Sequence, residues 1–461
     1  MTDISKLTFA GHLKATLVLG APLVAAQLSQ MLIGVVDTIM LGWLGTEELA
    51  AGTLAFQAFF ICLIFGIGFG AGMMPLIAGA LGADNPQEVR RATRMGLWAL
   101  LGLGLVLQLP LWFTGELLLL LGQDPLLAQL AEGYMRIAQW SLIPALMIIG
   151  LRAFLTSIER PNAVLGITIF TAILNGVFNY AFIFGNFGAP RLEMQGAAVA
   201  TLLANVLAFL AAFAYVAWLK EAKPYALFTR FWRPDWPALS ETFRIGVPVS
   251  LTIFAEAGLF SAASLMIGWL GTVPLAAHGI ALQIASIAFM IPMGLSQAGS
   301  VRVGRAAGAG DRRAIGRAGH ATLLLALIFA VASALVMLVY PDALVMLFLD
   351  ADDASLPAVV AYAVPLLWTA AAFQLVDSAQ AVGAGNLRGL KDTKIPLVIA
   401  VISYWGVGLS VAYIFAFPAG LGGVGVWSGL AAGLGVAAIL LNSRFERRDR
   451  LNLTPEGQLA H

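Results

Sequence analysis

Three acidic residues lie inside long apolar stretches of the sequence: Asp37, Glu256 and Asp377. Of the other 22 Asp and Glu residues, 21 lie outside such stretches, and Asp342 lies near the end of one. A carboxylate in the middle of a membrane costs about 2.5–3.5 kcal/mol on insertion scales, so acids placed there are usually functional. No Lys or Arg is expected at a comparable depth, so each acid is either protonated or neutralised by a bound cation. The three positions therefore predict reversible binding of a proton or a small cation.

Polar residues at helical spacing accompany the first of these acids. Asn175 and Asn179 are four residues apart and share one face of a helix, as do Thr201 and Asn205. Amide and hydroxyl oxygens suit a hard cation or a proton relay, so we expect this set to lie near Asp37. They also form ordinary hydrogen bonds between helices, which is our interpretation of Asn205.

The second half of the chain has its own polar companions. Around Glu256 and Asp377 we expect Gln283, Gln374 and Ser378, with Phe260 and Phe373 one turn from the acids. The two phenylalanines either line the site or simply pack. Asp350, Asp352 and Asp353 cluster in a loop, where they are either solvated or attract cationic substrates.

The amino-acid composition indicates the class of protein in which these residues lie. Of 461 residues, 60% are hydrophobic and only 11% are charged, against about 45–50% and 25% in soluble domains. Disorder is excluded because disordered chains are poor in apolar residues. The single cysteine, Cys62, excludes a disulfide framework, and the net charge of +1 gives no reason to expect nucleic acid. An integral membrane protein remains.

The apolar stretches predict helices and not a β-barrel. Barrel strands alternate apolar and polar residues over about ten positions, whereas these stretches are continuous and close to the roughly 20 residues of a spanning helix. We predict an all-α polytopic protein with twelve transmembrane helices. They are expected at about 16–40, 50–80, 95–115, 134–156, 163–185, 195–219, 243–267, 276–302, 320–348, 358–383, 395–417 and 424–442.

The distribution of Lys and Arg predicts the orientation. If the amino terminus is cytoplasmic and the chain crosses twelve times, 24 of the 26 basic residues fall on the cytoplasmic side. Only Arg136 and Arg191 fall on the opposite side. Both termini are therefore expected in the cytoplasm.

An internal repeat divides the chain into halves. LGWLGTEELAAGTLAFQ (41–57) and IGWLGTVPLAAHGIALQ (267–283) are identical at ten of 17 positions, with a constant offset of 226. The same offset pairs Gly20 with Gly246 and Pro22 with Pro248. Six helices per repeat is an even number, so the two bundles are parallel and related by a pseudo-two-fold axis along the membrane normal.

The repeat predicts an N-terminal lobe (1–219), a cytoplasmic linker (220–243) and a C-terminal lobe with a basic cytoplasmic tail (244–461). Two such bundles can enclose a central cavity and expose it to either side in turn, which favours transport over catalysis. An intramembrane enzyme is disfavoured because the helices contain no Ser/His dyad, HExxH motif or paired Asp at protease spacing.

Several segments together resemble the multidrug and toxic compound extrusion (MATE) transporters, most closely their bacterial NorM branch. The resemblance covers nearly all of residues 10–445. The segments that carry it are GAPLVAAQLSQMLIGVVDTIMLGWLG (20–45), ERPNAVLGITIFTAILNGVFNYAFIFG (159–185), MQGAAVAT (194–201), GVPVSLTIFAEAGLF (246–260) and GNLRGLKDTKIP (385–396). The major facilitator superfamily also has parallel six-helix halves. Its loop signature G-x-x-x-D-R-x-G-R-R is absent from LGADNPQEVRRATRMG (81–96).

The resemblance implies a cation-coupled antiporter that exports amphipathic, mostly cationic drugs across the bacterial inner membrane. It implies a cation or proton site at Asp37, Asn175, Asn179 and Thr201, and a second one, with Na⁺ as a possible ligand, at Glu256 and Asp377. It implies substrate contacts at Asp37, Gln283, Asp352, Asp353 and Phe373. A tyrosine that helps to hold the cation in some members is here Phe373, which weakens the case for Na⁺ at the second site.

The expected partners are therefore small-molecule drugs and membrane lipid, with no nucleic acid, in a protein that works as a monomer. No cofactor is expected beyond the coupling ion, Na⁺ or H⁺. The alternative is a flippase for lipid-linked precursors with the same architecture. A flippase would need a cationic cavity for pyrophosphate, whereas the intramembrane charges predicted here are acidic.

Overall fold

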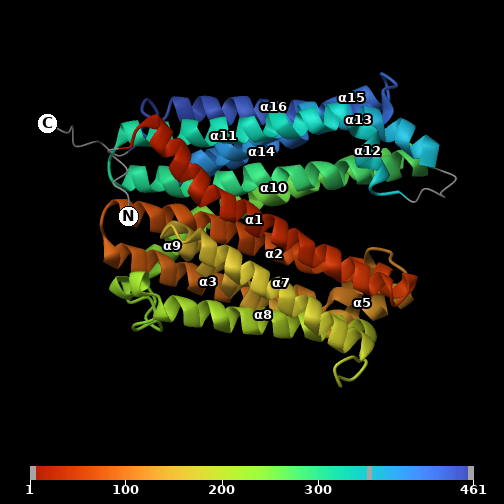
Figure 1. Ribbon diagram of the computed structural model, residues 1–461, viewed down its shortest axis with the longest axis horizontal. Helices are drawn as coiled ribbons and strands as arrows, with labels where there is room; N and C mark the ends of the chain where they lie inside the picture. Colours follow the sequence, from red (N-terminus) through yellow and green to blue (C-terminus); the bar gives the residue numbers. More distant parts are fainter. Residues whose placement is uncertain (1–6, 350–355, 455–461) are drawn as a thin grey trace. The chain divides into compact units, whose positions relative to one another are not determined.

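Most apolar runs of the sequence form helices that are longer than the runs themselves, although the run expected at 320–348 divides into α11 (Arg312–Val339) and the short α12 (Pro341–Met346). The computed structural model describes residues 7–349 and 356–454, and within these ranges it contains helices, turns and loops but no β-strand. Twelve helical stretches are long and apolar enough to cross a membrane, which confirms the predicted number. Figure 1 shows these stretches as long helices joined by short connections.

The twelve stretches comprise fourteen α-helices and two short irregular helices. They are α1 (Phe9–Gly42), α2 (Thr46–Gly82), α3 (Pro86–Trp112), α5–η2–α6 (Pro125–Ala138, Gln139–Ser141, Leu142–Ser157), α7 (Pro161–Phe184), α8 (Glu193–Trp218), α9 (Trp236–Gly268), α10 (Thr272–Gly308), α11 (Arg312–Val339), α13 (Leu356–Gly389), α14–η4–α15 (Lys394–Val401, Ile402–Gly408, Leu409–Ala416) and α16 (Gly422–Glu446). Three short helices connect them: α4 (Thr114–Leu120), η3 (Lys220–Tyr225) and α12 (Pro341–Met346).

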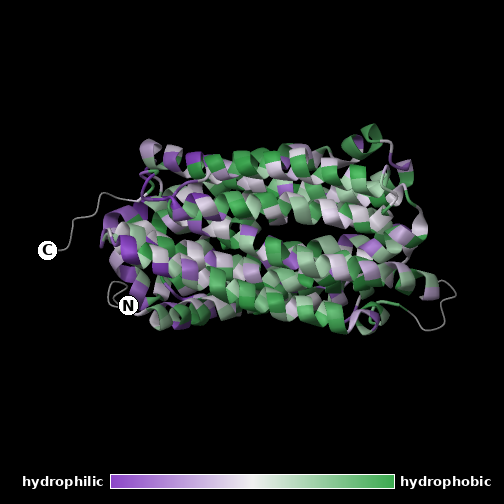
Figure 2. Ribbon diagram, turned by 90° about the horizontal axis from the view of Figure 1, so that it is seen from above, coloured by the Kyte–Doolittle hydropathy of each residue, from purple (hydrophilic) through white to green (hydrophobic). Residues whose placement is uncertain are grey.

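The helix ends extend beyond the apolar runs because polar residues outside the hydrocarbon region can still be helical. The α3 helix begins at Pro86, well before the apolar run at residue 95, and the Asn85 side chain caps it by accepting a bond from the Glu88 N–H (3.1 Å). In Figure 2 the helices are apolar along most of their length and hydrophilic mainly at their ends. Hydropathy therefore finds the middle of each helix and misses its first turns.

The chain forms two compact units, and the division between them follows the repeat. The N-terminal unit is Ala25–Ser250, and the C-terminal unit consists of the described residues up to Val24 and from Leu251 onward. The two division points lie 226 residues apart, which is the offset of the repeat. The first part of α1 thus belongs to the C-terminal unit, and the first part of α9 belongs to the N-terminal unit. The predicted lobes, 1–219 and 244–461, were defined by the sequence repeat and not by compactness, so they stay a prediction.

Two glycines allow close backbone contacts near the two division points: Gly68 lets α2 approach α9, and Gly294 lets α10 approach α1. In the N-terminal unit, a Cβ added at Gly68 of α2 would lie 2.4 Å from the Cα of Ser250. In the C-terminal unit, a Cβ added at Gly294 of α10 would lie 2.9 Å from the Cα of Val24. Both distances are shorter than real Cβ contacts, so only glycine permits this approach. Gly68 and Gly294 are 226 residues apart, as are Val24 and Ser250, so the same contact occurs once in each unit.

The helix starts that follow α2 and α10 are also equivalent. The Asp311 side chain caps α11 by accepting from the Ala314 N–H (2.9 Å), as Asn85 caps α3. Asp84 and Gly310 precede the two caps, and both have a left-handed backbone, with φ of 49° and 71°. Both pairs of positions differ by 226, so the repeat is present in the backbone as well as in the sequence.

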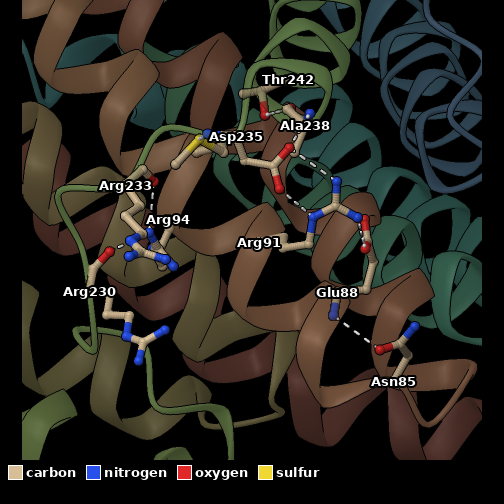
Figure 3. Close-up of polar contacts among 10 residues, drawn as sticks. Asn85, Glu88, Arg91, Arg94, Arg230, Arg233, Asp235, Ala238 and Thr242 are labelled. Carbon is tan, nitrogen blue, oxygen red and sulfur yellow. Dashed lines mark hydrogen bonds and ion pairs between the residues drawn. The ribbon is translucent and has the colours of Figure 1, made fainter.

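The predicted linker lies against α3 in the N-terminal unit, as Figure 3 shows. Arg91 donates from Nε and Nη2 to the two carboxylate oxygens of Asp235 (2.5 and 3.1 Å), and Arg94 donates to the carbonyls of Arg230 and Arg233 (2.6 and 2.8 Å). Asp235 also accepts from the Ala238 N–H (3.2 Å) at the start of α9. The Arg91 guanidinium, helped by this backbone bond, holds the pKa of Asp235 below its ordinary value. The linker is therefore fixed to its own unit by a charged, bidentate contact.

Candidate functional site

The first predicted cluster forms in the N-terminal unit, where α1 and α7 meet. Asn179 donates from Nδ2 to the Asp37 carboxylate (2.5 Å) and to Oδ1 of Asn175 (3.2 Å). Asn175 also hydrogen-bonds Asp37. The two asparagines are buried because they lie one turn apart on the inner face of α7, and Asp37 is half-buried. The structure thus brings together the three residues that the sequence grouped.

Thr201 joins this cluster through a tyrosine that the sequence reasoning missed. Tyr134 of α5 hydrogen-bonds Thr201 of α8 and lies within electrostatic range of Asp37. Asn205 donates to the Thr201 carbonyl (2.9 Å), one turn earlier on the same helix, whereas the sequence reasoning expected it to bond between helices. No sequence signal singled out Tyr134, since tyrosine near the end of a transmembrane helix is common at membrane interfaces.

The second cluster forms in the C-terminal unit and is centred on α13. Asp377 is only 2% exposed, and it interacts electrostatically with Glu256 of α9, which is half-buried. Gln374 and Ser378, one turn before and one residue after Asp377, are fully buried. Both polar ends of Gln374, Oδ1 of Asp377 and the Ser378 hydroxyl have no hydrogen-bond partner among the described residues. Buried polar atoms without partners are costly, so their accumulation around one acid indicates a place that binds something.

A π-helical segment, η4, completes this cluster. Tyr404 of η4 is fully buried and accepts a hydrogen bond from Nε2 of Gln380 (2.6 Å), and it lies within electrostatic range of both acids. Its neighbour Trp405 donates to the Ala255 carbonyl, the residue before Glu256 (3.2 Å). Single π-helical turns inside α-helices often occur at functional sites. The sequence reasoning missed Tyr404 and Gln380, because nothing in an apolar helix signals a change of helical period.

Phe373 is part of an aromatic group one turn from Asp377. It is 2% exposed and packs edge-on against Phe260 and Trp427, with ring centroids 6.0 and 5.4 Å apart. Trp427 donates to Nδ1 of His278 (3.2 Å), and Nε2 of His278 faces the Ser264 hydroxyl (2.9 Å). The predicted substrate contact of Phe373 stays a prediction, since in this conformation its ring is covered by other rings.

The sequence did not group one basic residue with the acids: Arg388 of α13 is within electrostatic range of Glu256. The expectation that no Lys or Arg lies at the depth of the acids stays a prediction. Arg388 lies in the last turn of α13, and its side chain is half-buried. Hydropathy assigns it to a loop because the apolar run ends before it.

Of the remaining predicted residues, Gln283 is the one that lies within the described part of the chain. Gln283 is half-buried on α10, and among the described residues it forms no hydrogen bond with Glu256 or Asp377. Asp352 and Asp353 lie outside the described residues. Within the described ranges no group of three or more His, Cys, Asp or Glu residues could hold a metal ion.

Twelve spanning helices in two repeat-related units, each with an intramembrane acid beside buried polar side chains, define a multi-pass membrane protein with the architecture of a secondary transporter. The MatE family model matches residues 22–181 and 248–414, and the starts of the two ranges again differ by 226. The chain belongs to the MatE family.

The relatives in sequence cover nearly the whole chain. The probable multidrug resistance protein NorM of Rhizobium meliloti (strain 1021) is 48% identical over 436 residues, which are 95% of this chain and 93% of that protein. The multidrug resistance protein NorM of Burkholderia vietnamiensis is 42% identical over 437 residues, 94% of each chain.

Solved structures share the fold. A crystal structure of MATE in complex with MaL6 superimposes with a TM-score of 0.87 at 23% identity, covering 95% of this chain and 97% of that one. A crystal structure of a eukaryotic MATE transporter gives a TM-score of 0.84 at 20% identity, covering 97% and 100%. At these identities the likeness shows that the fold is the same.

Proposed function

We propose that this protein is a cation-coupled antiporter that exports amphipathic, mostly cationic compounds, with Na⁺ or H⁺ as the coupling ion. The observation that carries the proposal is Asp377, a buried carboxylate with an unpartnered oxygen beside Glu256 and among unpartnered amide and hydroxyl groups. A proton or a small cation satisfies such a site, and intramembrane acids commonly mark ion pathways. The names of the relatives, multidrug resistance proteins, support drugs as the exported cargo.

Coupling requires that ion and drug stabilise different states of the transporter. A ligand that binds two conformations equally well shifts neither, so the ion must favour one state and the drug another. An inward ion gradient loads the carboxylates from outside, and that loading lowers the affinity for the drug, which leaves outward. The form that has released its ion to the cytoplasm then binds the next drug.

The proposal includes the setting of this cycle. The protein works as a monomer in the bacterial inner membrane. Both of its termini lie in the cytoplasm, an orientation that the distribution of Lys and Arg supports. Asp37 with its asparagine partners forms a second ion site in the N-terminal unit. The protein transports and does not catalyse a reaction.

Drug efflux from proteoliposomes tests the proposal. It is measured under an imposed Na⁺ gradient and, separately, under an imposed pH gradient. We expect Glu256→Gln and Asp377→Asn to abolish coupled efflux while the protein stays monodisperse, and Asp37→Asn to impair it. Glu47→Gln is the matched control, because Glu47 is an exposed acid in the first turn of α2. Wild-type efflux in both the Glu256 and the Asp377 variants would refute the assignment.

A further inference from the structure

A cleft of about 450 Å³ lies in the N-terminal unit, where α8 ends and the linker begins. The last turn of α8, the η3 helix and residues 226–229 line this cleft. Its wall is apolar at Val216 and Ala222, which are buried, and polar at Lys223 and Thr229, which are exposed. The cleft is therefore amphipathic, with an apolar wall and a positively charged edge.

Aromatic contacts fix the chain around the cleft. The ring of Tyr225 packs edge-on against Phe154 of α6, with ring centroids 6.1 Å apart. Phe228, which lines the cleft, packs against Phe213 of α8 with ring centroids 4.4 Å apart. Packed side chains thus hold the segment that forms the cleft, so its shape is part of the folded unit.

The charges between α8 and α9 do not cancel, because the acids there already have partners. In residues 219–235 the acids are Glu221, which forms an ion pair with Arg160, and Asp235, which forms one with Arg91. The cations of this segment are exposed, and none of them forms an ion pair with a residue that the structure describes; they are Lys220, Lys223, Arg230 and Arg233. The segment therefore presents an excess of positive charge around the cleft.

Three exposed tryptophans frame the same segment. Trp218 at the end of α8 is 80% exposed, Trp232 is 71% exposed, and Trp236 at the start of α9 is 69% exposed. Tryptophan is enriched where a membrane meets water, because its ring is largely apolar and its N–H group is polar. Ala217, the neighbour of Trp218, lines the cleft. These exposed rings indicate that the cleft lies at the level of the lipid headgroups.

We propose that this cleft binds the headgroup of an anionic phospholipid. The Lys223 ammonium group pairs with the lipid phosphate, the Thr229 hydroxyl donates to it, and the apolar wall takes the glycerol backbone and the first methylene groups. The inference rests on the proposed orientation, which puts the cleft at the cytoplasmic leaflet, where anionic lipids attract basic segments. The apolar wall favours a lipid over free phosphate, which has no apolar part.

Native mass spectrometry of the purified full-length protein with increasing phosphatidylglycerol tests the site. We expect one tightly bound lipid in the wild type and about fivefold weaker binding in Lys223→Gln, which corresponds to about 1 kcal/mol for one cation near an anionic surface. Lys223→Arg keeps the charge and should bind as the wild type does. Lys14→Gln is the matched control, because Lys14 is an exposed lysine of the C-terminal unit that forms no ion pair with a described residue. Its loss should leave this binding unchanged.

A second variant tests the cleft itself without a change of charge. Ala217→Trp fills the cleft from an exposed position of α8, so the packing of the helix is kept while the space for the headgroup is lost. We expect this variant to bind phosphatidylglycerol at least as weakly as Lys223→Gln does. Ala211→Trp is its control, because Ala211 is also exposed on α8 but does not line the cleft.

Several results would overturn the inference. Wild-type affinity in Lys223→Gln or in Ala217→Trp would mean that the cleft does not bind the lipid, and an equal loss in Lys14→Gln would mean that the attraction is not specific to it. Equal binding of zwitterionic phosphatidylcholine would exclude selection by charge. Displacement of phosphatidylglycerol by an equal concentration of inorganic phosphate would assign the cleft to a free anion. None of these measurements depends on efflux, so the inference and the proposed function can fail separately.

Discussion

Replacing Gly294 by alanine tests whether the close contact between α1 and α10 supports the C-terminal unit. The added Cβ would lie 2.8 Å from the backbone nitrogen of Val24 and 2.9 Å from its Cα. Ordinary contacts of a Cβ begin at 3.4 Å, so the two backbones would have to separate by about 0.6 Å. Backbone atoms in the middle of a helix cannot rotate away as the tip of a side chain can, so the contact must open.

The expected magnitude has two opposing terms. Overpacking a tight contact costs about 1–3 kcal/mol. Exchanging glycine for alanine inside a helix gains up to about 1 kcal/mol, because alanine loses less backbone freedom on folding. The Gly294→Ala variant should therefore be less stable than the wild type by about 0–3 kcal/mol, a range that includes no net change.

A second glycine on the same helix removes the ambiguity. Gly279 of α10 has no atom within 4 Å of an added Cβ, so Gly279→Ala should show only the gain in helix propensity. The difference in the free energy of unfolding between the two variants, about 1–3 kcal/mol, then measures the strain at Gly294 alone. Unfolding in mixed micelles with increasing sodium dodecyl sulfate, followed by tryptophan fluorescence, supplies these free energies.

The repeat provides a further check. Gly68→Ala should behave as Gly294→Ala does, since its Cβ would lie 2.4 Å from the Cα of Ser250. If Gly294→Ala proves as stable as Gly279→Ala, the contact is not tight and the argument from it is wrong.

Three other predictions follow from the contacts. Asn179→Ala removes a hydrogen bond to the Asp37 carboxylate, which is worth about 1.5–3 kcal/mol. At equal expression it should reduce efflux far more than Asn205→Ala, which loses only a bond to a backbone carbonyl. Equal effects of the two variants on efflux would count against the α1 site. Tyr404→Phe leaves the buried Gln380 amide without its acceptor and should lower the free energy of unfolding by about 1–3 kcal/mol. Tyr413→Phe is the control, because the Tyr413 side chain is 53% exposed and its change should not lower that free energy. A Tyr404→Phe variant as stable as the wild type would contradict the bond between Tyr404 and Gln380. The pKa of Asp235 is lowered in the folded state, so its contribution to stability is present above about pH 3.9 and is lost as the pH falls further. The protection of residues 226–235 against hydrogen exchange, taken relative to the intrinsic exchange rate at each pH, should therefore fall below that pH in the wild type, and Asp235→Asn should already show low protection at pH 7.

The sequence predicted the membrane-spanning helices well because their apolar runs are a local property. It also predicted that Asn175 and Asn179 lie together, since residues four apart share a helix face, while their place beside Asp37 was implied by the family resemblance. It did not predict Tyr404 or Arg388. The position of Tyr404 depends on a change of helical period in η4, and that of Arg388 on where α13 ends, and neither is encoded in hydropathy. Contacts between helices far apart in the chain depend on helix rotation, which a single sequence does not specify.

The division of the two units has a consequence for the order in which the protein can fold during synthesis. The N-terminal unit is continuous in the chain and has all its residues once Ser250 has been made. The first part of α1 is made before α10, and its close partner there, Gly294, follows Val24 by about 270 residues. At about 5–20 residues per second this is a delay of about 10–50 s. During that time the first part of α1 must stay in the membrane without its final neighbour, so a factor that holds single helices in the bilayer would act on this segment.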